Sequence, residues 1–377
     1  MKQVYLDHAA TTYIYDEVVE VMMESMKSNY GNPSSIHQFG RKAKVAVETA
    51  RKNIAKIIGC SSSEIIFTSS GTEGNNLILN NAVENLGVKT IITSKIEHHA
   101  VLNVVENLRV KDRIEVRFVG LDESGNVDLG DLESLLSEID GKVMVSLMMV
   151  NNEIGNILEF QKVGALCSKY DALFHTDAVQ AVGCIPINLN EFNVDFLVAS
   201  GHKFHGPKGV GFVFVKKDYV VKPMILGGNQ EKGVRSSTEN VHSIIGMEKA
   251  LNLSVSTMVK STEKMGELKS YFVQKLTDNF DGIQYNGNSK GGEYGVSKIL
   301  SVRFPKQNKM LLFSLDLKGV AASSGSACQS GGVKVSHVLK EFLSEEELKK
   351  TSIRFSFSDS VSFDELDHVI DSLNSIL

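Results

Sequence analysis

The chain has 377 residues, a length that predicts roughly two to three domains and burial of about three quarters of the unfolded surface, without help from disulfides or metals. Hydrophobic residues make up 42% and charged residues 23%, which is ordinary globular composition and argues against disorder. The net charge of −5 argues against a dedicated nucleic-acid binder or a binder of anionic membranes.

The compartment is predicted from the N-terminus, the hydropathy and the cysteines. The first ten residues include Asp7 and His8 and lack the apolar core of a signal peptide. The most apolar run, residues 143–150, is too short to span a bilayer. The chain has 4 cysteines and no CxxC pair, which excludes the usual zinc-finger and thioredoxin spacings. We therefore expect a cytoplasmic protein that does not associate with a membrane.

Short apolar runs alternate with helical patterns from residue 64 onward. The expected strands are residues 64–68, 90–94, 115–120, 143–150, 173–176 and 195–199. The expected helices are residues 71–85, 99–108, 131–139 and 161–170. Strands that are separated by helices of this length form βαβ units, so the pattern predicts an α/β fold with a mostly parallel, buried sheet.

The pattern changes after the last of these strands. Residues 209–216 (GVGFVFVK) predict an added strand at the edge of the sheet, and residues 238–279 have the spacing of one long helix or two. Farther along, strands are expected at residues 283–285, 298–304 and 352–356, and helices at residues 310–317 and 362–376.

Because the regular alternation of strands and helices ends and a different order of elements begins near residue 255, we predict two domains. The large domain would comprise residues 16–255. A smaller α+β domain would be formed by residues 1–15 together with residues 256–377.

Candidate ligand-binding residues follow the predicted strands, because ligands of an open parallel sheet lie beyond the carboxyl ends of its strands. Residues 69–73 (SSGTE) open a helix, and its free N–H groups suit a phosphate, although a simple capping turn is the more common explanation. Asp177 ends one strand and is either a helix cap or an acidic catalytic group. Lys203 follows another strand within a turn rich in Gly and His, and is either a surface lysine or a nucleophilic amine.

Three competing motifs are rejected. Ser200-x-x-Lys203 matches the Ser/Lys motif of penicillin-binding enzymes, but the companion motifs are absent. Pro207 stands where a phosphate loop requires Lys. Neither His202 with His205 nor His98 with His99 has an acidic partner at metal-ligand spacing, so no metal is predicted.

A phosphate-binding turn, a strand-end Asp and a strand-end Lys together suit pyridoxal 5′-phosphate. The lysine would form a Schiff base, and the aspartate would keep the pyridine nitrogen protonated. A further candidate is Cys328, which lies in a run of Gly and Ser (322–332) rather than among apolar residues. It is either an accessible, reactive thiol or an inert loop cysteine.

With these motifs together, the sequence resembles the cysteine desulfurases of the NifS/IscS type, in the class V branch of the fold-type I pyridoxal-phosphate enzymes. The resemblance runs through nearly the whole chain and implies a large domain with a seven-stranded type of sheet and a smaller domain. Its motifs are YLDHAATT (5–12), GNPSS-H (31–37), FTSSGTEGNN (67–76), EHHAV (97–101), VNNEIG (150–155), HTDAVQ (175–180), SGHK-HGPKG (200–209), RSST (235–238), SSGSAC (323–328) and RFSF (354–357).

The resemblance implies a role for each residue that matches a motif. Lys203 would bind the cofactor covalently and later move the substrate Cα proton. Asp177 would pair with the pyridine nitrogen, and Gln180 with the ring hydroxyl oxygen. His98 would stack on the ring and could serve in proton transfer.

The resemblance also implies residues for the phosphate and the substrate. The phosphate would be held by Gly71, Thr72, Ser200 and His202. Thr238 would reach the phosphate of the neighbouring subunit, which implies a homodimer with shared sites. Asn152 would contact both cofactor and substrate, and Arg354 would clamp the substrate carboxylate.

The implied activity is removal of sulfur from L-cysteine, which yields L-alanine and a persulfide on Cys328. The thiol would lie on a long, mobile loop of the small domain and pass its sulfur to an acceptor or scaffold protein, in iron–sulfur cluster assembly or tRNA thiolation. Two other enzyme readings are a pyridoxal-phosphate-dependent cysteine or cystine β-lyase and a selenocysteine lyase. A non-enzymatic reading is a silent partner protein in sulfur transfer, which would not need the full set of site residues.

Overall fold

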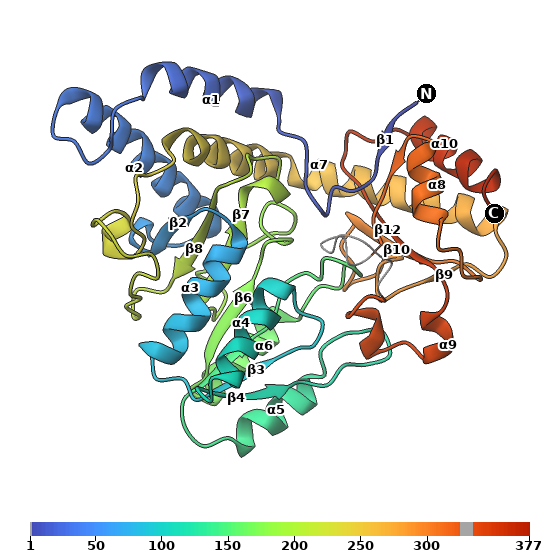
Figure 1. Cartoon of the computed structure of the whole chain (residues 1–377), viewed down its shortest axis with the longest axis horizontal. Coiled ribbons are helices and arrows are strands. Elements are labelled where there is room, and N and C mark those ends of the chain that lie inside the picture. Colours follow the sequence, from blue (N-terminus) through green and yellow to red (C-terminus); the bar gives the residue numbers. More distant parts are fainter. Residues whose placement is uncertain (1, 325–334) are drawn as a thin grey trace.

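The computed structural model describes residues 2–324 and 335–377, and its largest feature is a seven-stranded sheet (Figure 1). The strands lie in the order β2-β8-β7-β6-β5-β3-β4, and every neighbouring pair is parallel except the two that include β8. Their bounds are β2 (Ile65–Thr68), β3 (Thr90–Thr93), β4 (Glu115–Phe118), β5 (Val143–Ser146), β6 (Leu173–Asp177), β7 (Phe196–Ser200) and β8 (Gly211–Val215). The predicted α/β class and mostly parallel sheet are confirmed.

The position of β8 shows that the prediction of an edge strand at residues 209–216 was wrong. β8 lies between β2 and β7 and is antiparallel to both, so that Phe214 pairs with Ile65 on one side and with Leu197 on the other. All five of its residues are buried. An unbroken apolar run suits an interior strand, because both of its faces are covered by helices and both of its backbone edges are paired.

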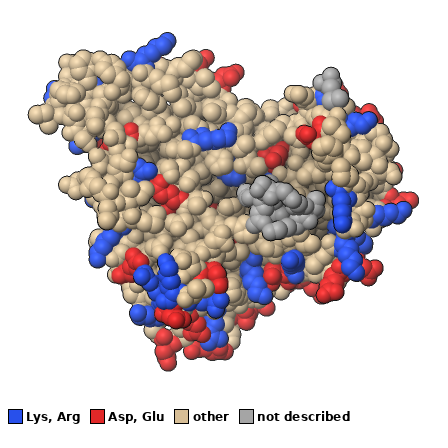
Figure 2. Space-filling view, in the orientation of Figure 1, with Lys and Arg blue, Asp and Glu red and all other residues tan. Residues whose placement is uncertain are grey.

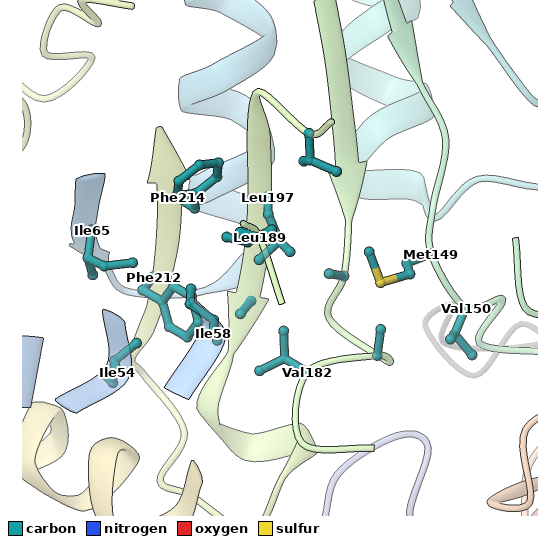
Figure 3. Packing of buried hydrophobic residues seen from close by; sticks show 14 of the residues in the cluster. Ile54, Ile58, Ile65, Met149, Val150, Val182, Leu189, Leu197, Phe212 and Phe214 are labelled. Atoms are coloured by element: carbon teal, nitrogen blue, oxygen red, sulfur yellow. The ribbon is translucent and has the colours of Figure 1, made fainter. Parts of the chain in front are cut away.

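Helices cover both faces of the sheet, and successive residues of each strand contact opposite layers. Ile66 packs with α3 and α4 on one face, whereas Ile65 packs with α2 on the other. Figure 3 shows this second face, where Ile54 and Ile58 of α2 lie beside Ile65 and Phe212. The helices that flank the sheet are α2 (Gln38–Ile58), α3 (Gly71–Glu84), α4 (His99–Val110), α5 (Leu129–Glu138) and α6 (Phe160–Lys169).

Two helices precede the first predicted strand, where the sequence analysis assigned no element. They are α1 (Asp16–Ser28) and α2. The buried apolar stripe of α2 has helical spacing and consists of Ala43, Val47, Ala50, Ile54, Ala55 and Ile58. The small alanine side chains make this stripe less conspicuous than the Val- and Ile-rich strands that follow, although its period of three to four residues is readable.

The pattern at residues 238–279 forms one helix, α7 (Val241–Asn279). Its first half packs through Ile244 and Met247 into the core beneath the large sheet, and its second half packs through Leu268 and Phe272 into a second core. Figure 1 shows α7 running from the region of α2 toward α10. The helix α7 continues through residue 255 without a break. The proposed division into two domains at this residue stays a prediction. No helix in the described part of the chain is long and apolar enough to cross a membrane.

The second core is built on a smaller antiparallel sheet of order β12-β10-β9. Its strands are β9 (Gln284–Tyr285), β10 (Ile299–Arg303) and β12 (Ser352–Ser356). The N-terminal strand β1 (Val4–Tyr5) pairs in parallel with β11 (Val320–Ala321) beside it. The accompanying helices are α8 (Leu311–Leu317), α9 (Glu345–Leu348) and α10 (Phe363–Asn374). The chain therefore begins and ends beside the same small sheet.

Gly74 permits the close approach of α3 to the sheet that places the start of this helix at the functional site. A Cβ at Gly74 would lie 2.7 Å from Val198 Cγ1 and 2.8 Å from Val213 Cγ1. Gly74→Ala is therefore expected to lower the free energy of unfolding by about 1–3 kcal/mol, measured by urea denaturation.

Gly266, in the interior of α7, supplies the matched control. Its nearest neighbour to a new Cβ is Ser297 Oγ at 3.9 Å, so Gly266→Ala is expected to stabilise the protein by about 0.5–1 kcal/mol through helix propensity. Equal effects of the two substitutions would contradict the packing explanation.

Candidate active site

A cavity of about 340 Å³ lies where β6 and β7 end, between the large sheet and β12. Of the predicted site residues, those that line the cavity are Gly71, Thr72, His98, Asn152, Asp177, Gln180, Ser200, His202, Lys203 and Arg354. All of them except Arg354 lie at strand ends or in the segments that follow strands of the large sheet, and the parallel strands bring these positions together at one edge.

The first turn of α3 forms one wall of the cavity. Ser70 caps the helix, and its side chain accepts a hydrogen bond from the Glu73 N–H at 3.2 Å. A Cβ at Gly71 would lie 2.6 Å from Val179 Cγ2, so only glycine lets the helix start approach the turn after β6 this closely. The remaining N–H groups of a first helical turn have no partner within the helix, and together with the helix dipole they suit an anionic group.

Asp177, the last residue of β6, is held in a fixed orientation. Its Oδ2 accepts a hydrogen bond from Asn75 Nδ2 at 2.7 Å, and its Oδ1 accepts one from the Val179 N–H at 3.0 Å. The side chain is buried at the wall of the cavity. A carboxylate that is oriented by two donors from the protein can still accept a proton-bearing nitrogen from a ligand.

Lys203 ends the short 3₁₀ helix η2 (Gly201–Lys203), directly after β7. Its Nζ donates to the carbonyl oxygens of Ala9 at 2.7 Å and Ala10 at 2.8 Å. Gln180 Nε2 donates to the same Ala9 oxygen at 2.8 Å. The N-terminal segment therefore orients the lysine and the glutamine together, and it forms part of the cavity wall.

His98 is the N-cap of α4, and its Nδ1 accepts a hydrogen bond from the Ala100 N–H at 3.1 Å. This contact requires an unprotonated Nδ1, so the neutral ring carries its proton on Nε2. Burial lowers the pKa of His98, and the nearby positive charges of Lys203 and His337 lower it further, although Asp177 raises it in part. His98 is thus a neutral imidazole in the cavity wall.

Arg354, on β12, reaches the cavity from the smaller sheet. Its guanidinium donates to Asp7 Oδ1 at 2.9 Å and to the Asn152 carbonyl at 2.8 Å. The residue is 3% exposed, and its Nε is buried without a hydrogen-bond partner among the described residues. A fixed guanidinium with an unused donor suits a carboxylate.

Comparison with known proteins agrees with this geometry. Residues 4–369 match the family described as aminotransferase class-V. The cysteine desulfurase IscS of Dictyoglomus turgidum is 42% identical over 379 residues, which cover 100% of this chain and 95% of that protein. The chain belongs to the cysteine desulfurases of the class V aminotransferase family. A second relative, the cysteine desulfurase IscS of Clostridium botulinum, is 36% identical, with 100% of this chain and 94% of that protein covered.

Solved structures of similar proteins share the fold of this cysteine desulfurase. A NifS-like protein matches with a TM-score of 0.91 and 35% identity, over 100% of this chain and 99% of that one. The NifS-like protein of Rickettsia africae matches with a TM-score of 0.89 and 34% identity, over 100% and 99%. The structure titled "SspA in complex with cysteine" matches with a TM-score of 0.81 and 29% identity, over 94% and 99%.

Class V aminotransferases and cysteine desulfurases depend on pyridoxal 5′-phosphate, and the cavity of this family member fits that cofactor. Two buried amide oxygens beside the cavity, Asn75 Oδ1 and Gln180 Oε1, have no hydrogen-bond partner among the described residues. Gln180 Oε1 is available to a ring hydroxyl, Asp177 to a ring nitrogen, and the first turn of α3 to a phosphate.

One predicted site residue of this desulfurase, within the described chain, does not join the cavity. Thr238 is exposed and does not line it, which leaves its predicted contact with a neighbouring subunit a prediction. Cys328 lies outside the described residues.

The structure adds residues that the sequence analysis did not assign to this desulfurase site. Ala9 and Ala10 act through backbone carbonyls, which no side-chain motif reveals. Asn75 lies within the matched FTSSGTEGNN motif and was readable as the residue one helical turn after Gly71. His337 lines the cavity, and its ring lies 4.5 Å from that of His99, centroid to centroid.

Proposed function

We propose that this protein removes sulfur from L-cysteine, giving L-alanine and a persulfide on Cys328. The observation that carries the proposal is a single cavity lined by a lysine, an aspartate and a buried arginine, namely Lys203, Asp177 and Arg354. The family relationship supports the reaction type, and the cysteine complex of the similar SspA supports the substrate.

The substrate carboxylate would bind Arg354. The hydrogen bonds to Asp7 and to the Asn152 carbonyl fix the plane of the guanidinium and leave Nε for the ligand. This arrangement would select an α-carboxylate, with the rest of the amino acid lying between β12 and the end of β7.

Proton transfer at Cα would fall to Lys203. When bound, pyridoxal 5′-phosphate supplies the electron sink that lets Cα lose its proton, and Asp177 would maintain this capacity by holding the pyridine nitrogen. Lys203 would attach the cofactor and then carry the Cα proton, with the Ala9 and Ala10 carbonyls orienting its Nζ. His98, neutral and with its proton on Nε2, would stack on the ring and serve in proton transfer.

Because His98 is proposed to work in its neutral form, its protonation state makes a testable prediction. A pKa below the ordinary value of about 6.5 means that the neutral ring persists at pH 6.5 and above, and is lost only at lower pH. The acid limb of kcat/KM is therefore expected below pH 6.5 or so, and His98→Gln, which cannot titrate, should lack it. A limb above pH 7 that disappears in His98→Gln would contradict the assignment.

Sulfur would leave the substrate by attack of the Cys328 thiolate. An S–S bond forms to the substrate sulfur as its bond to Cβ breaks. The electron pair of the broken bond stays with the carbon, which gains a proton and becomes the methyl group of alanine. The outer sulfur of the Cys328 persulfide would then be passed to an iron–sulfur scaffold or to a protein of tRNA thiolation. Transfer of ³⁵S from the labelled enzyme to purified acceptor proteins would test this step.

A homodimer is supported by an apolar surface. Exposed hydrophobic side chains on α1 recur at helical spacing, and others lie nearby in the sequence before α2; they are Val19, Met23, Met26, Tyr30 and Ile36. Figure 2 shows that the upper left of the molecule, over α1 and α2, has few charged residues. A pair of such surfaces would bury them, and Thr238 would then reach the neighbouring site. Sedimentation equilibrium measures the mass in solution, and a value equal to the monomer mass of 41.3 kDa would contradict the homodimer.

A reducing, cytoplasmic location is supported by the cysteines. Cys60, Cys167 and Cys184 are all free thiols. Burial raises the pKa of Cys60 to about 12 and raises that of Cys167 as well, so these thiols are poor nucleophiles. Cell fractionation of the native host would test the location.

The deciding experiment is product analysis with L-cysteine and a reductant, on the wild-type protein and on Cys328→Ser. Equal amounts of alanine and sulfide, both abolished by the substitution, are the expected result. A β-lyase would instead form pyruvate, ammonia and sulfide, and Cys328→Ser would not change the amounts of these products. Alanine released from selenocysteine by Cys328→Ser at the wild-type rate would favour a selenocysteine lyase, and no turnover at all would favour the silent partner.

A further inference from the structure

The turn that carries Lys203 is held by hydrogen bonds at each of the three carbonyls of η2. The Gly201 oxygen accepts hydrogen bonds from the N–H groups of Phe204 and Gly206, within the turn itself. The His202 oxygen accepts from the Thr12 N–H at 3.0 Å and from Thr12 Oγ1 at 2.9 Å. The third carbonyl, that of Lys203, accepts its hydrogen bond from a different part of the chain.

The third anchor is Lys298, which immediately precedes β10. Its Nζ donates to the Lys203 carbonyl oxygen at 2.9 Å. Lys298 is 6% exposed, and no carboxylate pairs with it in the described parts of the chain. A buried ammonium without a counter-ion is costly, so a compensating role at its location is expected.

This turn needs such anchoring because the chain after it is strained. His205 has a φ of 65°, in the left-handed region that residues with a Cβ rarely adopt. Its N–H donates to Thr12 Oγ1 at 2.8 Å, and its ring stacks on Tyr15 with centroids 4.2 Å apart. A conformation of this kind persists only where the surrounding structure determines it from several sides.

Lys298 also joins the two walls of the cavity. Its carbonyl oxygen accepts a hydrogen bond from the Phe357 N–H at 2.8 Å, just beyond the strand that carries Arg354. One side chain therefore ties the backbone of Lys203 to the sheet that holds the arginine. The positive charge of Lys298 also contributes to the lowered pKa of His202, about 4, after the larger effects of burial, Lys203 and Lys208.

We propose that Lys298 is a positioning residue, which sets the orientation of Lys203 relative to Arg354 by anchoring the Lys203 carbonyl. The inference rests on the proposed function, in which Lys203 binds the cofactor and moves the Cα proton. A lysine backbone that can shift misplaces Nζ, and a displacement of this kind slows a positioned proton transfer more than it weakens substrate binding.

The matched control is Lys269 on α7. It is 4% exposed, and its Nζ donates to the carbonyl oxygens of Ser289, Val296 and Ile299, on the same stretch of chain as Lys298 but not on the Lys203 turn. If Lys298 merely stabilised this stretch, Lys298→Met and Lys269→Met would behave alike.

Three readouts on the holoenzymes test the proposal: kcat and KM for L-cysteine, visible circular dichroism of the bound cofactor, and borohydride trapping of the cofactor on Lys203 followed by mass spectrometry. Lys298→Met is expected to lower kcat by about tenfold with KM within about twofold, to weaken the dichroic band and to slow trapping. Lys298→Arg, which keeps a donor, should recover most of the loss. Lys269→Met should lower thermal stability and leave all three readouts near wild type.

Equal behaviour of Lys298→Met and Lys269→Met in kcat, dichroism and trapping would overturn the positioning role. So would a Lys298→Arg variant that is well folded but no better than Lys298→Met, if the latter is impaired. Should Lys298→Met not fold, Lys298→Gln, whose shorter side chain cannot span the same distance, decides the question by the same readouts. Absence of a trapped adduct on Lys203 in the wild-type protein would refute the proposed function instead.

Discussion

Replacing Lys203 by alanine is expected to reduce alanine formation from L-cysteine by at least about a thousandfold. The substitution removes the amine that would attach the cofactor and the group that would carry the Cα proton. Asp177, Gln180 and the first turn of α3 remain, so the cofactor should still bind, but without a covalent link. Single-turnover measurement of alanine, together with borohydride trapping, separates loss of chemistry from loss of cofactor.

Lys208 provides the control for this substitution. It lies five residues farther along the same turn, but it is exposed and does not line the cavity. Lys208→Ala should therefore retain wild-type turnover and covalent trapping. Substantial turnover in Lys203→Ala, or a comparable loss in Lys208→Ala, would be inconsistent with the assigned role.

The largest expected effect on stability comes from a buried ion pair between α2 and residue 231. The Arg51 guanidinium donates to both carboxylate oxygens of Glu231, each at 2.7 Å, and both side chains are buried. Arg51→Met is expected to lower the free energy of unfolding by about 3–5 kcal/mol, because it leaves the Glu231 carboxylate buried with the Phe67 N–H as its remaining donor. Urea denaturation measures the change.

A double variant tests whether the unpaired charge is the cause. In Arg51→Met with Glu231→Gln, the amide oxygen can still accept from the Phe67 N–H, and no charge remains buried. The double variant should therefore be more stable than Arg51→Met alone. If adding Glu231→Gln instead costs further stability, the loss in the single variant is due to packing.

The same ion pair bears on function, because it anchors the segment that leads to Thr238. The backbone has positive φ at Glu231 (46°), Lys232 (59°) and Ser237 (102°), and Arg235 pairs with Glu73 of α3 at 2.9 Å. A segment strained at both ends depends on such anchors. If Thr238 contacts the cofactor phosphate of a neighbouring subunit as proposed, Arg51→Met should also weaken cofactor retention, measured by dialysis against buffer without cofactor.

Much of the fold and the site was readable from sequence because the signals are local. A buried parallel strand is an uninterrupted apolar run, and its end is marked by the small or polar residues that follow. Asp177 and Lys203 became candidates in this way, since a parallel sheet places the ends of β6 and β7 at one edge. The start of α3 was found from its capping residue and glycine.

Other features depend on which segments meet, and no local pattern encodes that choice. The apolar run at residues 209–216 predicts a strand, but only its pairing with β2 and β7 makes it an interior strand of the sheet. The carbonyls of Ala9 and Ala10 are chemically like any others until the N-terminal segment is placed against Lys203.

The amino-acid sequence by itself determined the class of fold and most of the succession of strands and helices after residue 64, and it predicted the residues that would hold a phosphate, a pyridine nitrogen and a carboxylate. The fold class and the strand-end residues follow from side-chain chemistry and periodicity along the chain, whereas the carboxylate-binding role of Arg354 was implied by the family resemblance. Only the tertiary structure decided the place of β8, the orientation of Arg354 by Asp7, and the anchoring of Lys203 by Lys298. These contacts join residues far apart in the chain, and their energies exist only once both cores have packed.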